Sequence, residues 1–294
     1  MKKAYICAAI SIFLWSTFAT SSKLLLGAFG NYQVLCISSL IAALALLCAV
    51  IVTGKFKFMK KYRLKDYAIM ALIGLPGTFF YYVFYYAGAD RLPASQAFTV
   101  NYMWPIMSIV FACIILKERL TPRKCIAIAV SFAGVAIISG GGLFNFDKNI
   151  LIGILFCLMG AVSYGLFTAL NTKYEYDVFV SMMINSLVAF VLCFVIIAAK
   201  GELFLPNLTQ TLGFTWNGIF VIAIPNATWI LALNCKNTSK ISNLAYITPF
   251  LSLIWTFLIL REPINIYSII GLVVIVLGIL IQIKESKGKE KELK

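Results

Sequence analysis

Apolar residues recur along the chain in long runs separated by short polar segments. The runs cover residues 4–29, 32–53, 67–87, 94–116, 124–142, 150–171, 178–199, 215–233, 241–260 and 264–283. A helix needs about 20 apolar residues to cross the hydrocarbon core of a bilayer, whereas a membrane β-barrel alternates over strands of about ten residues. The pattern therefore predicts an all-α polytopic membrane protein with ten transmembrane helices.

The composition supports a chain covered by lipid. Of its 294 residues 62% are hydrophobic and only 12% are charged, and the mean hydropathy is +0.94. A soluble domain carries roughly 25% charged residues, because its surface must face water. The eight cysteines form no Cys-x-x-Cys pair and histidine is absent, so we expect no metal site and no cofactor.

The placement of the basic residues predicts the orientation. With the N-terminus inside, 20 of the 25 lysines and arginines lie in cytoplasmic segments, including a basic tail at 284–294. Four lie outside (Arg91, Lys148, Lys200 and Arg261), and Lys23 lies within the first run. By the positive-inside rule both termini are cytoplasmic. Because the net charge of +14 is distributed over loops, it does not indicate nucleic-acid binding.

The chain contains an internal repeat. A shift of 144 residues aligns 93–138 with 237–282 without a gap, and the matches include Tyr102/Tyr246, Pro105/Pro249, Glu118/Glu262 and Gly134/Gly278. This predicts two five-helix repeats, 1–142 and 150–283. The odd number of helices inverts the second repeat, as in many secondary transporters. The two glutamates mark helix ends, where we expect capping or ion pairing.

At these residues the chain resembles the drug/metabolite transporter superfamily, specifically the EamA-domain family of ten-helix transporters. The resemblance rests on Trp15-Ser16-x-Phe18, Ala94-Ser95-Gln96-Ala97, Leu116-Lys117-Glu118, Ala161-x-x-Tyr164-Gly165 and Leu260-Arg261-Glu262-Pro263. It implies a transporter of the bacterial plasma membrane that exports or exchanges small metabolites, often amino acids. Ser16 replaces the glycine that usually follows the tryptophan.

Pro105 and Pro249 lie inside predicted spans at matching positions of the two repeats. Proline breaks the helical hydrogen-bond ladder, and paired breaks point to a transporter site, although a simple packing kink would give the same pattern. Asn101, Tyr102 and Tyr246 lie within one turn of these breaks. Pro225 precedes Asn226 and Trp229 in a similar way. The candidate substrate-binding residues from these regions are therefore Asn101, Tyr102, Pro105, Asn226, Trp229, Tyr246 and Pro249.

Four further candidates admit two interpretations each. Lys23 could reach the membrane surface or contact substrate. Tyr82 belongs to a cluster with Tyr81, Tyr85 and Tyr86, which is typical of an interfacial aromatic belt but could also line a cavity. Trp15 and Tyr164 lie at similar places in the first helices of the two repeats, where they could pack or contact substrate.

The predicted function is secondary transport by alternating access, with a lipid or glycolipid flippase of the same superfamily as the alternative. No predicted span holds an interior carboxylate, and no nucleophile has a catalytic partner, so we expect no enzyme. The substrate would be a small neutral or zwitterionic metabolite held between helices 1, 3, 4, 6, 8 and 9. The protein would act as a monomer or weak dimer.

Overall fold

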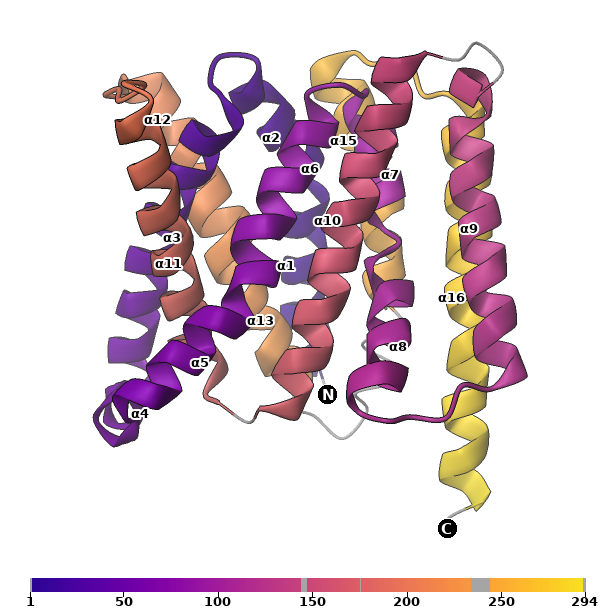
Figure 1. Ribbon diagram of the computed structural model, residues 1–294, viewed down its shortest axis with the longest axis horizontal. Coiled ribbons are helices and arrows are strands. Elements are labelled where there is room, and N and C mark those ends of the chain that lie inside the picture. The colour runs from indigo at the N-terminus through magenta and orange to yellow at the C-terminus, as the bar shows by residue number, and fades with distance from the viewer. Residues whose placement is uncertain (1, 144–146, 175, 234–243, 293–294) are drawn as a thin grey trace.

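The computed structural model describes residues 2–143, 147–174, 176–233 and 244–292, and this part of the chain is helical without any β-strand. In chain order the elements are α1 (Lys2–Ser16), α2 (Phe18–Leu26), α3 (Asn31–Val52), α4 (Phe56–Lys61), α5 (Leu64–Gly74), the π-helix η1 (Leu75–Phe80), α6 (Tyr81–Ala89), α7 (Ala94–Asn101), α8 (Trp104–Ile115), α9 (Pro122–Leu143), α10 (Lys148–Lys173), α11 (Val178–Ala199), α12 (Leu208–Thr215), the π-helix η2 (Trp216–Ala223), α13 (Ile224–Leu233), the 3₁₀-helix η3 (Ala245–Ile247), α15 (Thr248–Leu260) and α16 (Ile266–Glu292). The helices stand side by side, and α1 begins at the same end of the bundle at which α16 ends (Figure 1). We call this the termini end.

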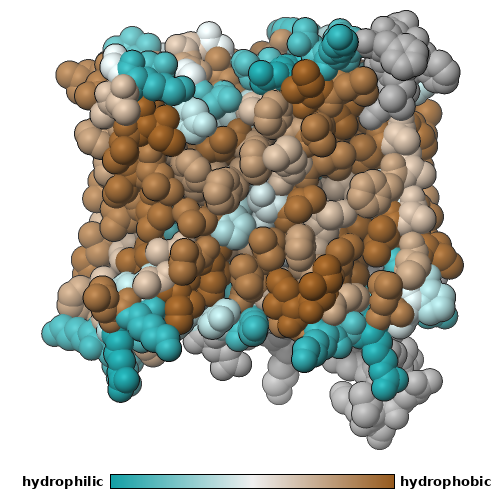
Figure 2. All heavy atoms as spheres, viewed as in Figure 1, coloured by the Kyte–Doolittle hydropathy of each residue, from teal (hydrophilic) through white to brown (hydrophobic). Residues whose placement is uncertain are grey.

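The helices are long and apolar enough for a membrane protein. Among the described residues, six segments could cross a bilayer: Lys3–Leu26, Asn31–Val52, Leu64–Ala89, Ala94–Ile115, Lys148–Lys173 and Val178–Ala199. Two shorter apolar segments are Ala245–Leu260 and Ile266–Ile281. Figure 2 shows the consequence at the surface, where hydrophobic side chains form a broad belt between two hydrophilic edges. The polytopic α-helical class is therefore confirmed, while the full number of ten spans stays a prediction.

Several predicted spans are broken near their middle. Pro76, Pro105, Pro225 and Pro249 each lie in the first turn of a new helical segment. A proline in this position loses no hydrogen bond of its own segment, because the first amides of a helix have no partner in it. At Pro105 the interruption separates two half-helices, α7 and α8, and before Pro249 it takes the form of the 3₁₀-helix η3. At Pro76 and Pro225 the helix instead continues, with the π-helices η1 and η2 at these places.

The first span is also broken, which its sequence did not predict. The hydroxyls of Ser16 and Thr17 donate to the carbonyls of Phe13 and Leu14, at 2.7 and 2.8 Å. Such local bonds compete with the helical ladder. The same two hydroxyls also accept hydrogen bonds from indole N–H groups. Trp255 donates to Ser16 at 2.9 Å, and Trp216 donates to Thr17 at 3.1 Å.

Two other segments differ from the sequence expectation. The connection between the second and third apolar runs contains a short helix, α4, for which the apolar pattern gave no expectation. The last helix continues to Glu292 through most of the basic tail, which was expected to begin at residue 284. Lys236, Lys240 and Ser239, used in the charge count and the repeat alignment, lie outside the described residues.

Small residues bring α9 and α16 into backbone contact at one side of the bundle. A Cβ atom on Gly134 would lie 2.8 Å from the Gly271 carbonyl oxygen, and one on Gly278 would lie 2.8 Å from the Ala127 carbonyl oxygen. The repeat relates these two contacts, because Gly134 is matched to Gly278 and Ala127 is matched to Gly271. The Ser131 hydroxyl donates to the carbonyl of its own counterpart in that shift, Ile275, at 3.3 Å. Membrane helices associate through such small-residue interfaces.

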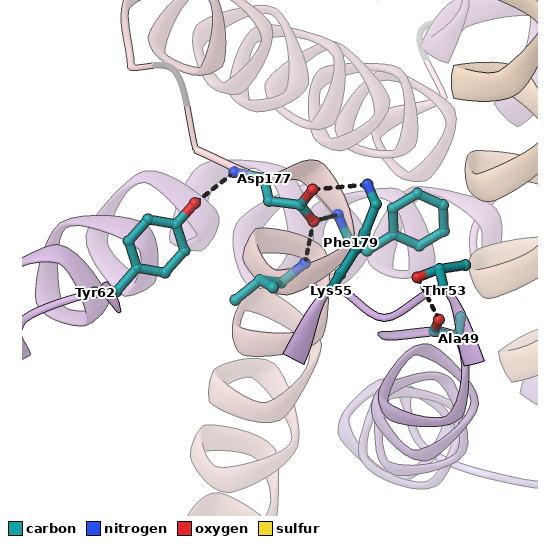
Figure 3. A network of polar contacts seen from close by, with 7 residues as sticks. Ala49, Thr53, Lys55, Tyr62, Asp177 and Phe179 are labelled. Carbon is teal, nitrogen blue, oxygen red and sulfur yellow. Dashed lines mark hydrogen bonds and ion pairs between the residues drawn. The ribbon is translucent and has the colours of Figure 1, made fainter. Parts of the chain in front are cut away.

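At the other side of the bundle α3 packs along α11, and their ends are joined by a polar network (Figure 3). Asp177 caps α11 by accepting hydrogen bonds from the amides of Phe179 and Val180. The same carboxylate pairs with Lys55 at 2.7 Å, and the Asp177 amide donates to the Tyr62 hydroxyl at 2.9 Å. This network ties the segment after α3 to the start of α11.

We expect Asp177→Ala to lower the thermal unfolding midpoint of the purified protein more than Asp147→Ala does. Both aspartates cap a helix, and losing a cap costs about 1 kcal/mol. Among the described residues the Asp177 side chain also pairs with Lys55, and alanine removes this ion pair together with the cap, whereas the bonds of Asp147 are to two amides of its own helix. Equal shifts of the midpoint would show that the network beyond the cap contributes nothing.

Candidate substrate cavity

A cavity of about 280 Å³ lies in the middle of the bundle, where the broken helices meet. Its walls come from α1, α2, η1, α6, α7, α8, α10, α11, η2, α13, η3 and α15. The lining residues are Trp15, Phe18, Gly77, Thr78, Tyr81, Tyr82, Phe98, Asn101, Tyr102, Trp104, Tyr164, Phe167, Thr168, Met182, Ser186, Val221, Ile222, Asn226, Trp229, Ala245 and Thr248. A small concave site lined by apolar groups with a few polar ones is typical of a ligand pocket.

The two helix breaks of the repeat are bonded to each other beside the cavity. Pro249 has no amide hydrogen, so the Ala245 carbonyl lacks the donor that a regular helix would supply four residues later. The Tyr102 hydroxyl donates to this carbonyl at 2.7 Å. Tyr102, which lies between α7 and α8, thus supplies the hydrogen bond that the carbonyl before α15 lacks. In the repeat, Tyr102 is matched to Tyr246.

Ten of the 21 described residues that line the cavity are aromatic. Tyr164 of α10 lies at the centre of one group, with ring centroids 4.9 Å from Tyr81 and 5.1 Å from Trp104. Trp15 and Trp229 form a second pair with centroids 5.4 Å apart. Edge and tilted contacts of this kind are favourable, so the rings hold one another in place around the space.

The polar groups of the wall are neutral. Asn101 is 2% exposed, and its amide nitrogen donates to the Tyr81 hydroxyl at 2.9 Å, while its amide oxygen has no hydrogen-bond partner. Asn226 donates to the Ile222 carbonyl one turn back. None of the described residues that line the cavity carries a charge at neutral pH.

Seven of the eleven candidate residues from the sequence line the cavity. They are Trp15, Tyr82, Asn101, Tyr102, Tyr164, Asn226 and Trp229. Pro105 and Pro249 lie at the starts of α8 and α15, and Tyr246 lies in η3. All three are next to lining residues but are not themselves among the described lining residues. Lys23 lies apart from the cavity, where its ammonium donates to the carbonyls of Ala89 and Leu92.

The tyrosine cluster does not form an interfacial belt, so that interpretation is wrong. Tyr85 and Tyr86 are 0% exposed, and Tyr81 is 8% exposed. The rings of Tyr81 and Tyr82 reach the cavity, and those of Tyr85 and Tyr86 fill the next turn of α6. Helical periodicity places these residues on overlapping faces but does not say which face meets lipid when every neighbour is apolar.

Several lining residues were not among the candidate substrate-binding residues, including Phe18, Thr78, Trp104, Phe167, Thr168, Ser186 and Thr248. Two of them, Trp104 and Thr248, could have been found from the internal repeat. Trp104 and Thr248 are matched by the 144-residue shift, and each begins the helix after its break. Ser186 comes from α11, a helix that was not expected to contribute.

The chain is similar in sequence to known transporters. The model of the EamA-like transporter family matches residues 2–140 and again residues 151–283. The chain is 29% identical to an uncharacterized transporter of Clostridium kluyveri, over all of this chain and 97% of the other. It is 23% identical to the aromatic amino acid exporter YddG of Ancylobacter novellus, over 61% of this chain and 63% of that protein.

One crystal structure superposes with a TM-score of 0.70 at 20% sequence identity and covers 95% of this chain and 96% of the other. This likeness supports the fold. The family model spans most of the chain in two segments, and its members are multi-pass membrane transporters and not enzymes. The chain belongs to the EamA-like transporter family, within the drug/metabolite transporter superfamily.

Proposed function

We propose that this transporter exports or exchanges small neutral or zwitterionic amino acids, preferentially aromatic ones, through the central cavity by alternating access. The observation that carries the proposal is the uncharged, ring-lined cavity between paired half-helices. Broken helices around a central site are the arrangement that secondary transporters use. The aromatic amino acid exporter among the relatives agrees in substrate class and direction.

Alternating access requires two structurally related halves, and the contacts support ten spans in two inverted repeats. The exchange of the Gly134–Gly271 and Gly278–Ala127 contacts by the repeat shift is what a two-fold relation between the halves would produce. Lys117 and Arg261 are also matched by the shift, and both have positive φ, 57° and 58°. Few residues other than glycine adopt this conformation, so the shared backbone supports a common origin of the two turns.

The ends of the half-helices suggest how a zwitterion is held without charged side chains. The C-terminus of α7 at Asn101 carries partial negative charge, and the N-termini of α8 at Trp104 and α15 at Thr248 carry partial positive charge. We infer that the substrate ammonium lies towards α7 and its carboxylate towards α8 or α15. The aromatic side chain would then pack among the rings of Trp15, Tyr164 and Trp229.

The surroundings of the protein follow from the same proposal. We infer a bacterial plasma membrane with both termini in the cytoplasm, because that orientation places 20 basic residues inside and four outside. We further propose that the protein acts as a monomer or weak dimer.

Transport by the purified protein in lipid vesicles tests the proposal. Vesicles loaded with labelled tryptophan or phenylalanine should lose the label faster than protein-free vesicles, and labelled lysine should stay inside because the cavity offers no counter-charge. Movement of a fluorescent lipid probe without any amino acid would instead establish the flippase alternative. Movement of neither class would reject both functions.

A further inference from the structure

The connection between α6 and α7 closes the bundle at the end opposite the termini end (Figure 1). We call residues 89–95 the α6–α7 corner. Its backbone is held from two other parts of the chain by side chains of opposite charge. Lys23 of α2 donates to the carbonyls of Ala89 and Leu92, the latter at 2.8 Å. Glu262, which follows α15, accepts from the amide of Ala94 at 3.1 Å and contacts the amide of Ser95 at 3.5 Å.

Each charge matches the helix end that it contacts. The last carbonyl of α6, that of Ala89, carries partial negative charge and meets the ammonium of Lys23, which also binds the Leu92 carbonyl in the connection. The first amides of α7 carry partial positive charge and meet the carboxylate of Glu262. No ion pair is formed by either side chain among the described residues. Both charged side chains therefore bind backbone groups of the α6–α7 corner.

The corner covers the path from the cavity to this end of the protein. Along α6, Tyr81 and Tyr82 line the cavity, Tyr85 and Tyr86 fill the next turn, and Ala89 begins the corner. Phe18 of α2 stacks on Tyr85 with ring centroids 4.6 Å apart. Ala89, Leu92 and Ala94 are at most 1% exposed. A substrate leaving the cavity in this direction has to displace the corner.

Resting on the proposed alternating access, we propose that Lys23 and Glu262 are the positioning residues that latch the α6–α7 corner over the cavity and must release it for transport. Both side chains act on backbone groups and neither lines the cavity. They control the opening of one end and do not select the substrate. Lys23 thereby has a role that differs from both snorkelling and substrate contact.

The Glu262 side chain is directed at the corner by its backbone. Arg261 ends α15 in the left-handed region, with φ 58° and ψ 22°. The repeat places the same turn at Lys117, before Glu118, whose carboxylate instead pairs with Lys124 at 2.8 Å. Glu118 thus offers a matched control, since it has the same residue type and turn but no contact with the α6–α7 corner in the described part of the chain.

A thiol at Ala97 reports the opening of the latch. Ala97 is 0% exposed and lies one helical turn from Asn101, on the face of α7 that lines the cavity. The experiment uses full-length protein with its eight cysteines replaced and Ala97→Cys added, in lipid nanodiscs. A maleimide reagent then reaches both ends of the protein. The measured quantity is the labelling rate without substrate.

We expect Glu262→Gln and Lys23→Gln each to raise the labelling rate on the order of 5- to 30-fold, because a helix-end charge in a partly buried place is removed. Lys23→Arg, which keeps charge and donors, and Glu118→Gln should label at the parent rate. Unchanged rates in both glutamine variants, with unfolding midpoints like the parent, would overturn the latch. An equal rise in Glu118→Gln would also overturn it, by showing general loosening.

Because the labelling needs no substrate, its failure differs from a failure of the proposed function. Vesicles that export aromatic amino acids while the glutamine variants label slowly would reject the latch and keep the substrate assignment. The proposal further expects Glu262→Gln and Lys23→Gln to change the maximal flux but to leave the substrate concentration at half-maximal flux within about twofold, since uniform binding in the cavity is untouched. Weaker substrate binding in these variants would place the two residues in the cavity instead.

Discussion

Replacing Gly271 with leucine is expected to prevent the accumulation of folded protein. A Cβ atom at this position would lie 2.6 Å from the Gly134 carbonyl oxygen and 2.4 Å from a side-chain carbon of Ile138. The first neighbour is backbone and moves only if α9 and α16 separate. Overpacking typically costs about 1–3 kcal/mol, and here a whole helix interface is displaced. If protein is recovered, we expect its unfolding midpoint to fall on the order of 10 °C.

Gly27→Leu is the control for this substitution, because it adds the same side chain to a glycine without close neighbours. A Cβ atom on Gly27 meets only carbonyl oxygens of its own turn, at 3.5 and 3.6 Å. Yield and midpoint are measured by size-exclusion chromatography and thermal scanning of the purified protein. Normal yield of the Gly271 variant would mean that the two helices are not in backbone contact.

Replacing Asn101 with leucine is expected to reduce amino acid flux on the order of 10- to 100-fold while the protein stays folded. Asn101 is the buried amide of the cavity wall, and its nitrogen holds the Tyr81 hydroxyl. Leucine fills a similar volume but neither holds Tyr81 nor offers an oxygen to a substrate. Losing a buried polar partner costs about 1–3 kcal/mol, and each 1.4 kcal/mol corresponds to about tenfold in an equilibrium.

Asn171→Leu is the control, because it makes the same substitution at an asparagine of another predicted span. Its amide donates to the Phe167 carbonyl of its own helix at 3.1 Å, and it is not among the described lining residues. Flux into or out of vesicles is measured for both variants at equal protein content. A similar loss of flux in the two variants would show that Asn101 acts on helix stability and not on the substrate.

The polytopic fold could be predicted from the sequence because spans have a required length and an apolar composition. The approximate position of the cavity could also be predicted, since prolines within predicted spans mark the helix breaks that surround it. Asn101 and Tyr102 were selected only for their place beside Pro105, and both line the cavity. The bond from Tyr102 to the Ala245 carbonyl joins the two breaks, and no local pattern contains it.

The rest depended on tertiary packing. The break at Thr17 comes from hydroxyls that bond to the preceding turn, and serines and threonines also occur inside unbroken helices. The burial of Tyr85 and Tyr86 could not be separated from a lipid-facing belt, because every face of that helix is apolar. Lys23 required a partner, but its partners are the carbonyls of a corner 66 and 69 positions away in the chain, and backbone groups leave no signature in a sequence.

The uncharged wall of the cavity has a consequence for energetics. Moving one elementary charge across a membrane potential of 100 mV changes the free energy by about 2.3 kcal/mol. The described residues around the cavity would carry no charge through this field when the site turns from one side to the other. A zwitterionic substrate would add no net charge either, so the membrane potential would do no net work on the cavity walls and the substrate between them.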